Sequence, residues 1–517
     1  MKNRQIDAAW IYHNGTKHSY RSIRANPHYL DFDNQPVPFK IYTELDPIAL
    51  PADLSSSGMP SLSAISAVTA RRDRHASPTK QTLAEILFLC AGITRRRKYP
   101  GGEMLFRAAA CTGALYHVDL YLVCDELQEI PAGVYHFSPH DFALRRLRQG
   151  DFRGVLARAS GAEPSVVEAP VVLLCASTFW RNAWKYQARA YRHCYWDDGT
   201  MIANLLAAAA ARGLPAKVVI GFVDAAISEL LGLDPKREAP LSLVSLGCGA
   251  AQPVLPSTSL VPQVLQIQPL SKREVDYPAI RAMHEASSLE SADEVVQWRA
   301  ASDNLNGVHH DRSTNGRLVF LQALSDDDMP TDTIEEVIVR RGSTRQFARQ
   351  SISFGQLSVL LGRATRGISA DFLSTGDSFN QLYLIVHAVD DLASGAYVYR
   401  RDLHALELLK EGDFRRQAGD LGLGQDIPAD CSVNVYFLAD LNRLLDRFGN
   451  RGYRAGQLEA SIIGGKLYLA AYAQGLGASG LTFFDDDVTE FFSPHAAGKS
   501  VMFLIAVGKS LKRASQT

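Results

Sequence analysis

Apolar residues in the first half of the chain recur with the periods of both helices and strands. Leu83, Ile86, Leu87 and Cys90 share one face of a helix, and the pattern predicts that this helix ends at Gly92. Short runs rich in β-branched and large apolar residues predict buried strands. These runs are 120–124, 171–175, 216–222 and 241–246.

Two further segments have clear signatures. Residues 198–213 are Ala-rich and apolar on nearly every side, which predicts a buried helix ending at Gly213. Residues 133–137 and 144–147 alternate as a hairpin does, with the turn at 138–141. The first 60 residues show no sustained period and are predicted to be an arm lying over a domain.

The order of these features returns later in the chain at a constant displacement. Gly133 and Tyr135 recur as Gly395 and Tyr397, each 262 positions on. The pairs 150–153 and 412–415, 191–192 and 453–454, and 213–214 and 475–476 follow at the same displacement. Matches without a gap over this length indicate a duplicated domain. The predicted divisions are an arm (1–60), a first domain (61–252), a connector (253–330) packed across both copies, and a second domain (331–517).

Composition and charge narrow the function classes. A chain of 517 residues with 46% hydrophobic and 21% charged residues has material for two cores. Its net charge of -1 disfavours nucleic acid or an anionic membrane as partner. The beginning of the chain lacks an apolar core of signal-peptide length, and the seven cysteines are scattered. We therefore expect a cytoplasmic protein with reduced thiols.

No metal site is expected, since His309-His310-Asp311 has no third ligand at helical spacing.

Candidate chemistry concentrates just past the middle of the chain. The segment 340–347 holds three arginines and a serine directly after the apolar run 334–339, which predicts a short helix leading into extended chain. Guanidinium groups present planar donors that suit phosphate oxygens, and a hydroxyl with turn amides completes such a cradle. A solvated basic face is the structural alternative.

The spacing Arg341-Gly342-Ser343-Thr344-Arg345-Gln346-Phe347 resembles the Arg-x-Ser-x-(Arg/Lys)-x-Phe signature of the flavin-dependent nitroreductase superfamily. In that family the two basic residues and the serine hold the phosphate and ribityl chain of FMN. The resemblance implies an α+β fold with a mostly antiparallel sheet in each copy. Because the family forms dimers with FMN between subunits, it also implies that the two copies form a pseudo-dimer within one chain.

The two copies differ at the family's cofactor positions. The first copy reads Ala70 to His75 where the second has the phosphate motif. The first copy instead has a segment, 107–116, that resembles the family's Arg-x-x-Pro-Ser-x-Gly-x-x-Tyr turn and departs from it at Ala110 and Cys111. The second copy, at 373–380, is less similar to that turn. The resemblance therefore implies one complete FMN cleft. Its predicted cofactor residues are Arg341, Gly342, Ser343, Arg345, Arg107, Cys111, Thr112, Gly113, Gly477, Ala478, Ser479, Gly480 and Lys509.

The glycine-rich loop at residues 475–480 suits a flavin site, because a flat isoalloxazine ring requires close approach of backbone amides. A tight helix-to-strand turn explains the loop equally well, and Lys509 is also compatible with a surface lysine.

One pair of residues indicates a subgroup. Lys185-Tyr186 resembles the Lys-Tyr pair of SagB-type dehydrogenases, FMN enzymes that oxidise azolines on ribosomal peptides. The pair is the predicted catalytic acid/base set, the alternative being a solvated lysine beside a packed tyrosine. The resemblance implies an FMN-dependent oxidoreductase transferring hydride at flavin N5 to or from a small-molecule or peptide substrate. A general NAD(P)H-dependent nitro or quinone reductase and a flavin-free tandem scaffold remain alternatives. Whether the chain pairs again into a larger assembly is open.

Overall fold

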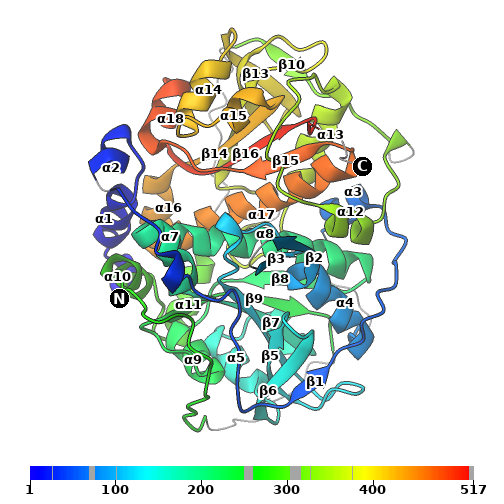
Figure 1. The fold of residues 1–517 in the computed structure, drawn as a ribbon, viewed down its shortest axis with the longest axis vertical. Coiled ribbons are helices and arrows are strands. Elements are labelled where there is room, and N and C mark those ends of the chain that lie inside the picture. The colour runs from blue at the N-terminus through cyan, green and yellow to red at the C-terminus, as the bar shows by residue number, and fades with distance from the viewer. Residues whose placement is uncertain are drawn as a thin grey trace.

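The computed structural model describes residues 1–25, 27–68, 76–99, 102–249, 260–302, 316–325, 328–374 and 376–511. It consists of two α+β domains that meet along a layer of central helices (Figure 1). The prediction of fold class and of tandem domains is confirmed. Two segments named above, Ala70 to His75 and His309 to Asp311, lie outside the described residues.

The arm and the first domain contain the following elements. The arm carries η1 (Lys2–Arg4), α1 (Asp7–Gly15), α2 (Tyr20–Ala25), η2 (Phe32–Asn34) and β1 (Pro47–Ala49). Next come α3 (Ser61–Ser66), α4 (Lys80–Ala91), β2 (Ile93–Tyr99), β3 (Gly102–Arg107), η3 (Thr112–Ala114), β4 (Val118–Cys124), β5 (Gly133–Ser138), β6 (Ala143–Gln149), α5 (Arg153–Ala159), α6 (Pro164–Glu168), β7 (Val171–Thr178), α7 (Phe179–Tyr186), η4 (Gln187–Arg189), α8 (Ala190–Ala211), β8 (Ala216–Val219), α9 (Asp224–Leu231) and β9 (Glu238–Leu246).

The connector and the second domain follow. The connector contributes α10 (Pro278–Ala286), α11 (Ala292–Ala300) and β10 (Leu318–Phe320). The second domain contains α12 (Ile334–Arg340), α13 (Phe354–Ala364), β11 (Asn380–Val386), β12 (Gly395–Arg400), β13 (Ala405–Glu411), α14 (Arg415–Leu421), α15 (Asp426–Asp430), β14 (Val433–Ala439), α16 (Leu441–Phe448), α17 (Arg451–Ala473), β15 (Gly477–Gly480), α18 (Asp485–Phe492) and β16 (Ser500–Gly508).

Each domain is built on a seven-stranded sheet with the same strand order. The orders are β1-β6-β5-β4-β7-β9-β8 and β10-β13-β12-β11-β14-β16-β15, and neighbouring strands in both pair antiparallel. The register shifts by one residue at Val134/Tyr135 in the first sheet and at Ala396/Tyr397 in the second. Irregularities at equivalent places confirm the duplication beyond the sequence matches.

The two domains meet where α8 and α17 cross (Figure 1). A Cβ atom on Gly199 would lie 1.8 Å from Ser461 Oγ, and one on Gly465 would lie 2.5 Å from Ala203 Cβ. The helices therefore approach backbone to backbone at glycine positions. The prediction placed the start of the first of these helices at residue 198, whereas α8 begins at Ala190. The intervening aromatic and polar residues are weak helix formers, and burial in this interface overrides their propensity.

Buried ion pairs repeat across the interface with two-fold character. Asp224, which begins α9 in the first domain, accepts hydrogen bonds from Arg451 and Arg454 of α17 at 2.6 and 2.7 Å. In the reciprocal contact, Asp485 of α18 accepts bonds from Arg189 and Arg192 of the first domain at 3.0 and 2.5 Å. Each domain thus gives one carboxylate to two arginines of the other, as the subunits of a symmetric dimer do. The prediction of an intrachain pseudo-dimer is confirmed.

The arm and connector join the domains further. The arm forms the short helices α1 and α2 at the seam and adds β1 to the outer edge of the first sheet (Figure 1). Helix α1 contacts both domains, since Asn450 Oδ1 accepts the Ala9 amide and the Tyr12 hydroxyl donates to the Ala188 carbonyl oxygen. In the connector, Trp298 Nε1 donates to the Phe448 carbonyl oxygen and Arg299 donates to that of Ser160. The connector therefore contacts both copies. Within the described residues, no helix combines the length and apolar character needed to cross a membrane.

Candidate cofactor site between the two halves

A cavity of about 340 Å³ lies on the seam between the domains. The first domain lines it with the turn before β4, the end of α7 and one face of α8. The second lines it with the segment after α12, α17 and the chain around β15. The lining residues are Ala110, Cys111, Thr112, Gly113, Lys185, Tyr186, His193, Trp196, Asp197, Thr200, Ser343, Arg345, Gln425, Tyr468, Gly480, Leu481, Thr482 and Phe503. This volume lies within the roughly 300–1,000 Å³ typical of small-molecule sites.

The motif after α12 is fixed by backbone contacts at both ends. A capping box of Thr333 and Glu336 begins α12, and the chain becomes extended at Arg341. The Thr344 amide then donates to the Ala478 carbonyl oxygen at 2.8 Å, and Phe347 pairs with Ser510 beyond β16. This extended course brings Ser343 and Arg345 to the cavity, where Ser343 Oγ lies 3.3 Å from the Tyr468 hydroxyl.

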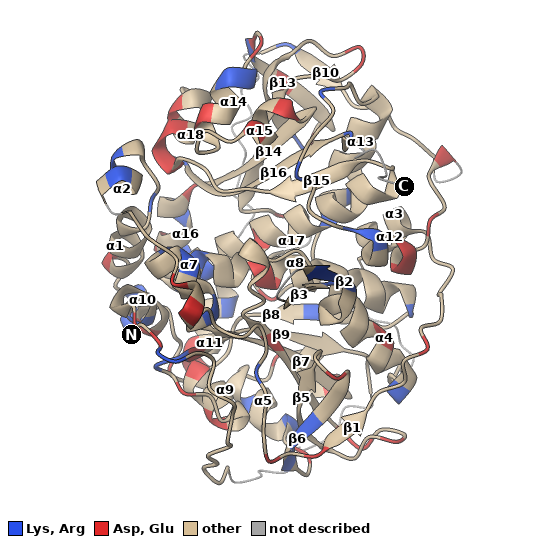
Figure 2. Cartoon of the chain, in the orientation of Figure 1, with Lys and Arg blue, Asp and Glu red and all other residues tan. Residues whose placement is uncertain are grey.

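Arg341 and Gly342 lie behind this lining. The buried Arg341 guanidinium donates to the carbonyl oxygens of Ala108 and Arg107 at 2.9 and 3.2 Å, so it ties the motif to the first domain. Arg95 of β2 approaches the same place, its guanidinium 3.9 Å from where a Cβ of Gly342 would lie. Figure 2 shows the basic ends of α12 and β2 beside the central helices.

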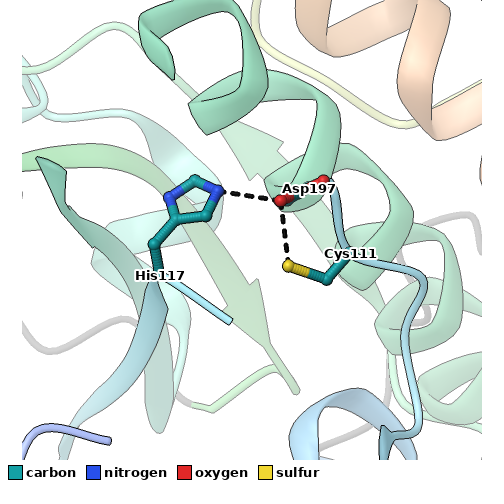
Figure 3. Close-up of side chains that lie close together, drawn as sticks. All are labelled: Cys111, His117 and Asp197. Carbon is teal, nitrogen blue, oxygen red and sulfur yellow. Dashed lines mark hydrogen bonds and ion pairs between the residues drawn. The ribbon is translucent and has the colours of Figure 1, made fainter. Parts of the chain in front are cut away.

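One carboxylate fixes the turn at residues 111–113 in the first domain. Asp197 of α8 accepts hydrogen bonds from the Thr112 amide and hydroxyl at 2.9 and 2.8 Å, from the Cys111 thiol at 3.0 Å and from His117 Nε2 at 2.8 Å (Figure 3). Burial, and then the charge of Asp197, raises the pKa of the Cys111 thiol well above its usual range. Cys111 is therefore a neutral donor. Gly113 follows with a φ of +68°, a conformation that favours glycine.

Cys111, His117 and Asp197 lie within 4.8 Å of one another, a separation that a metal ion could bridge. Hydrogen bonding to Asp197 accounts for their arrangement in full. The second domain has an equivalent carboxylate, Glu459, which accepts hydrogen bonds from the Ser378 hydroxyl and from the Phe379 and Asn380 amides. Because that copy does the same without cysteine or histidine, we assign the cluster to anchoring the turn.

Lys185 and Tyr186 end α7 at the mouth of the cavity. Burial, and then the positive charge of Arg345, lowers the pKa of Lys185. Burial, with Asp197 nearby, raises the pKa of Tyr186, so the phenol stays protonated. The Lys185 ammonium lies 5.4 Å from the centre of the Tyr186 ring, and the side chains of Lys185 and Arg345 form no hydrogen bond within the described residues. Two cations, one from each domain, thus face the cavity without an acidic partner.

The glycine-rich loop forms β15 and the chain after it. Gly477 is required by the close approach of Thr344, whose Oγ1 would lie 2.2 Å from a Cβ at that position. Ser479 Oγ and Thr482 Oγ1 are buried and have no hydrogen-bond partner among the described residues. Unsatisfied buried hydroxyls are costly, and Thr482, which lines the cavity, is placed to gain a partner from a ligand bound there.

The structure gathers most of the predicted residues and places others elsewhere. Cys111, Thr112, Gly113, Lys185, Tyr186, Ser343, Arg345 and Gly480 line the cavity, whereas Arg107, Arg341, Gly342, Gly477, Ala478, Ser479 and Lys509 do not. Arg107 faces away and donates to the Pro38 carbonyl oxygen. Lys509 is exposed beside the motif, its carbonyl oxygen accepting the Ala348 amide. The sequence interpretation missed His193, Trp196, Asp197, Thr200, Gln425, Tyr468 and Thr482 as lining residues. The helical spacing of His193, Trp196, Asp197 and Thr200 could have indicated a shared face.

The equivalent cleft on the other side of the seam is filled by the chain itself. Sheet register makes Ile220 the counterpart of Thr482, and Gly221 is the next residue along the chain. Their amides donate to the Asp371 carboxylate at 2.9 Å each. Four aromatic rings pack beside it in a chain of contacts at 5.5–6.0 Å, formed by Trp298, Phe448, Phe379 and Phe372.

Another cavity, of about 550 Å³, lies between α7 and α10. Four of its charged residues form two ion pairs, Arg237 with Glu274 and Arg281 with Asp276. It contains none of the motif residues.

Comparison with known proteins agrees with this architecture. The sequence profile of the Nitroreductase family matches residues 70–248 and 338–509. A candidate nitroreductase of Methanocaldococcus jannaschii, MJ1384, is 28% identical over 177 residues, which span 34% of this chain and 84% of that protein. The microcin B17-processing protein McbC of Escherichia coli is 27% identical over 157 residues, 29% of this chain and 54% of McbC. The trifolitoxin-processing protein TfxB of Rhizobium leguminosarum bv. trifolii is 30% identical over 149 residues, 28% of this chain and 40% of TfxB.

One solved structure matches over nearly the whole length. The crystal structure of a candidate nitroreductase from Anabaena variabilis superposes with a TM-score of 0.78 at 23% identity, covering 98% of this chain and 99% of that one. The tandem arrangement is thus a fold found in another protein. With two profile matches on two equivalent sheets, this chain belongs to the nitroreductase family.

Proposed function

We propose that this protein is an FMN-dependent oxidoreductase of the SagB type, which oxidises an azoline ring on a peptide or a related small substrate. The observation that carries the proposal is the seam cavity, which joins Ser343 and Arg345 of one domain to Lys185 and Tyr186 of the other. The likeness to McbC and TfxB, both named as toxin-processing proteins, supports a peptide substrate.

The residues present fit the cofactor. Arg345 and Ser343 would contact its phosphate and ribityl chain, and the turn at Cys111 to Gly113 would face its ring. The buried Thr482 hydroxyl, which has no partner among the described residues, would gain one from a polar ring edge. When bound, FMN supplies the acceptor for a hydride at N5.

Side chains of the protein would accept the proton that the substrate loses. Oxidation of an azoline to an azole removes one hydride and one proton from adjacent ring atoms. Lys185, whose pKa is lowered, would accept that proton at Nζ in its neutral form. Tyr186 stays protonated and would donate a hydrogen bond to the ring. The wall of Trp196 and Phe503 would exclude water from this exchange.

Turnover of two substrate classes tests the proposal. The purified, FMN-loaded protein should convert a thiazoline-bearing peptide to its thiazole, detected as a loss of two mass units, and oxidise NADPH slowly with a nitroarene. Rapid NADPH oxidation without azoline conversion would favour a general nitro or quinone reductase. A colourless protein that takes up no FMN would favour a binding scaffold.

Arg345→Ala should weaken FMN binding by about ten- to a hundredfold, since a charge-assisted hydrogen bond to phosphate contributes about 1.5–3 kcal/mol. Quenching of FMN fluorescence on titration measures the change. Arg349→Ala is the matched control, because Arg349 lies four residues on and pairs with Asp430 at the surface. Equal affinities of the two variants would remove Arg345 from the cofactor site.

A further inference from the structure

One histidine that lines the seam cavity takes no part in the proposed chemistry. His193 of α8 is 1% exposed and lines the cavity, yet its ring lies next to Tyr186 with the ring centres 4.6 Å apart and the planes nearly perpendicular. On its other side it lies 4.8 Å from the centre of the Trp196 ring. The imidazole is therefore held rigidly beside the predicted catalytic pair.

A buried amide orients this imidazole. His193 Nδ1 lies 2.8 Å from Asn182 Oδ1, and both residues are fully buried. Because an amide oxygen only accepts, Nδ1 carries the hydrogen and Nε2 keeps its lone pair. Nε2 hydrogen-bonds to no other group in the described part of the chain. Burial, followed by the nearby Arg189 and His117, lowers the pKa of His193 well below its usual range and keeps the ring neutral.

The duplication supplies an internal comparison. At the displacement of 262 residues, Asn182 corresponds to Leu444 and His193 to Ala455, and both of these apolar residues are buried. Residues that hold the domains together recur unchanged, as Arg192 does in Arg454. The fold therefore needs no polar pair at these positions, and the pair exists only where there is a cavity.

We propose that the Asn182–His193 pair determines specificity in the cleft by presenting Nε2 of His193 as a neutral acceptor for a backbone N–H of the substrate peptide. This inference rests on the proposed function, which identifies the ligand of the cleft as a peptide substrate. An aliphatic pair would leave that N–H unpaired on binding, and such a loss is costly in a buried site.

A set of matched probes tests the inference. One probe is a thiazoline-bearing peptide amide, and the others replace each N–H flanking the ring by an ester oxygen, one at a time. Native FMN-loaded protein should bind one ester about tenfold more weakly than the amide. His193→Ala and Asn182→Leu, which copy the second domain, should bind that ester and the amide alike, and His193→Gln should restore part of the difference. No discrimination by the native protein, or discrimination kept in His193→Ala, would overturn the inference.

A second measurement does not depend on the substrate. Long-range proton–nitrogen spectra of protein with nitrogen-15 histidine, assigned through His193→Ala, should show His193 protonated at Nδ1 alone at pH 7. Asn182→Leu should shift it toward a mixture of tautomers. A hydrogen on Nε2, or a charged ring, would overturn the inference. If the probes fail to bind at all, the proposed function fails, and these spectra still decide the state of His193.

Discussion

Asp224→Ala is expected to lower the free energy of unfolding by about 3–5 kcal/mol, the usual effect of removing one partner from a buried ion pair. The change leaves Arg451 and Arg454 buried at the seam without their shared carboxylate. Asp485→Ala should have a similar effect through the reciprocal contact. Denaturant unfolding followed by circular dichroism measures both.

Asp486→Ala is the control for these variants. Asp486 pairs with Lys17 but its side chain is 74% exposed, and exposed pairs contribute little. A loss equal to that of Asp485→Ala would show that the buried pairs do not hold the domains together.

The loss in free energy of unfolding caused by Asp224→Ala should depend on pH. Burial alone would raise the pKa of Asp224, but Arg451 and Arg454 lower it to about 2. A carboxyl with a depressed pKa contributes stability above its unfolded pKa of about 3.9 and loses it as the pH falls through the folded value. The difference between native protein and variant should therefore shrink between about pH 4 and pH 2. A constant difference over that range would contradict the assignment.

Lys185→Ala should lower kcat for azoline oxidation by about 10²- to 10⁴-fold, the typical contribution of a positioned acid or base. The flavin should stay bound, because the predicted phosphate contacts come from the second domain. Tyr186→Phe should also lower kcat, with the ring packing against His193 kept. Initial rates and the flavin spectrum of each variant test this.

The duplication provides the control. Arg447 is the counterpart of Lys185 and donates to the Ala301 carbonyl oxygen beside the filled cleft. Arg447→Ala should keep native kcat. An equal loss in both variants would indicate a general structural effect and remove Lys185 from the chemistry.

The duplicated fold and half of the site were predictable from sequence because they depend on local order. The displacement of 262 residues recurs in the strands, and Gly92 ends α4 as predicted. Ser343 and Arg345 reach the cavity because an extended chain alternates its side chains, so residues 343 and 345 share a face.

The remainder depends on contacts between distant segments. Arg341 belongs to the motif, yet its guanidinium is used by carbonyl groups of residues 107 and 108, more than 200 positions away. Asp371 fills the second cleft through amides of another domain, which no local pattern reveals. The orientation of His193 depends on Asn182, which lies on a different helix, so no local pattern reveals it.

The number of flavins bound per chain tests the central claim most directly. Saturating the purified protein with FMN, removing the excess, and comparing flavin absorbance with protein concentration should give one equivalent, lost in the weaker-binding Arg345→Ala. Among the residues that the structure describes, one seam cleft is open, and the other holds Asp371 and packed aromatic rings. Two equivalents, or one equivalent retained at native affinity in Arg345→Ala, would contradict the account.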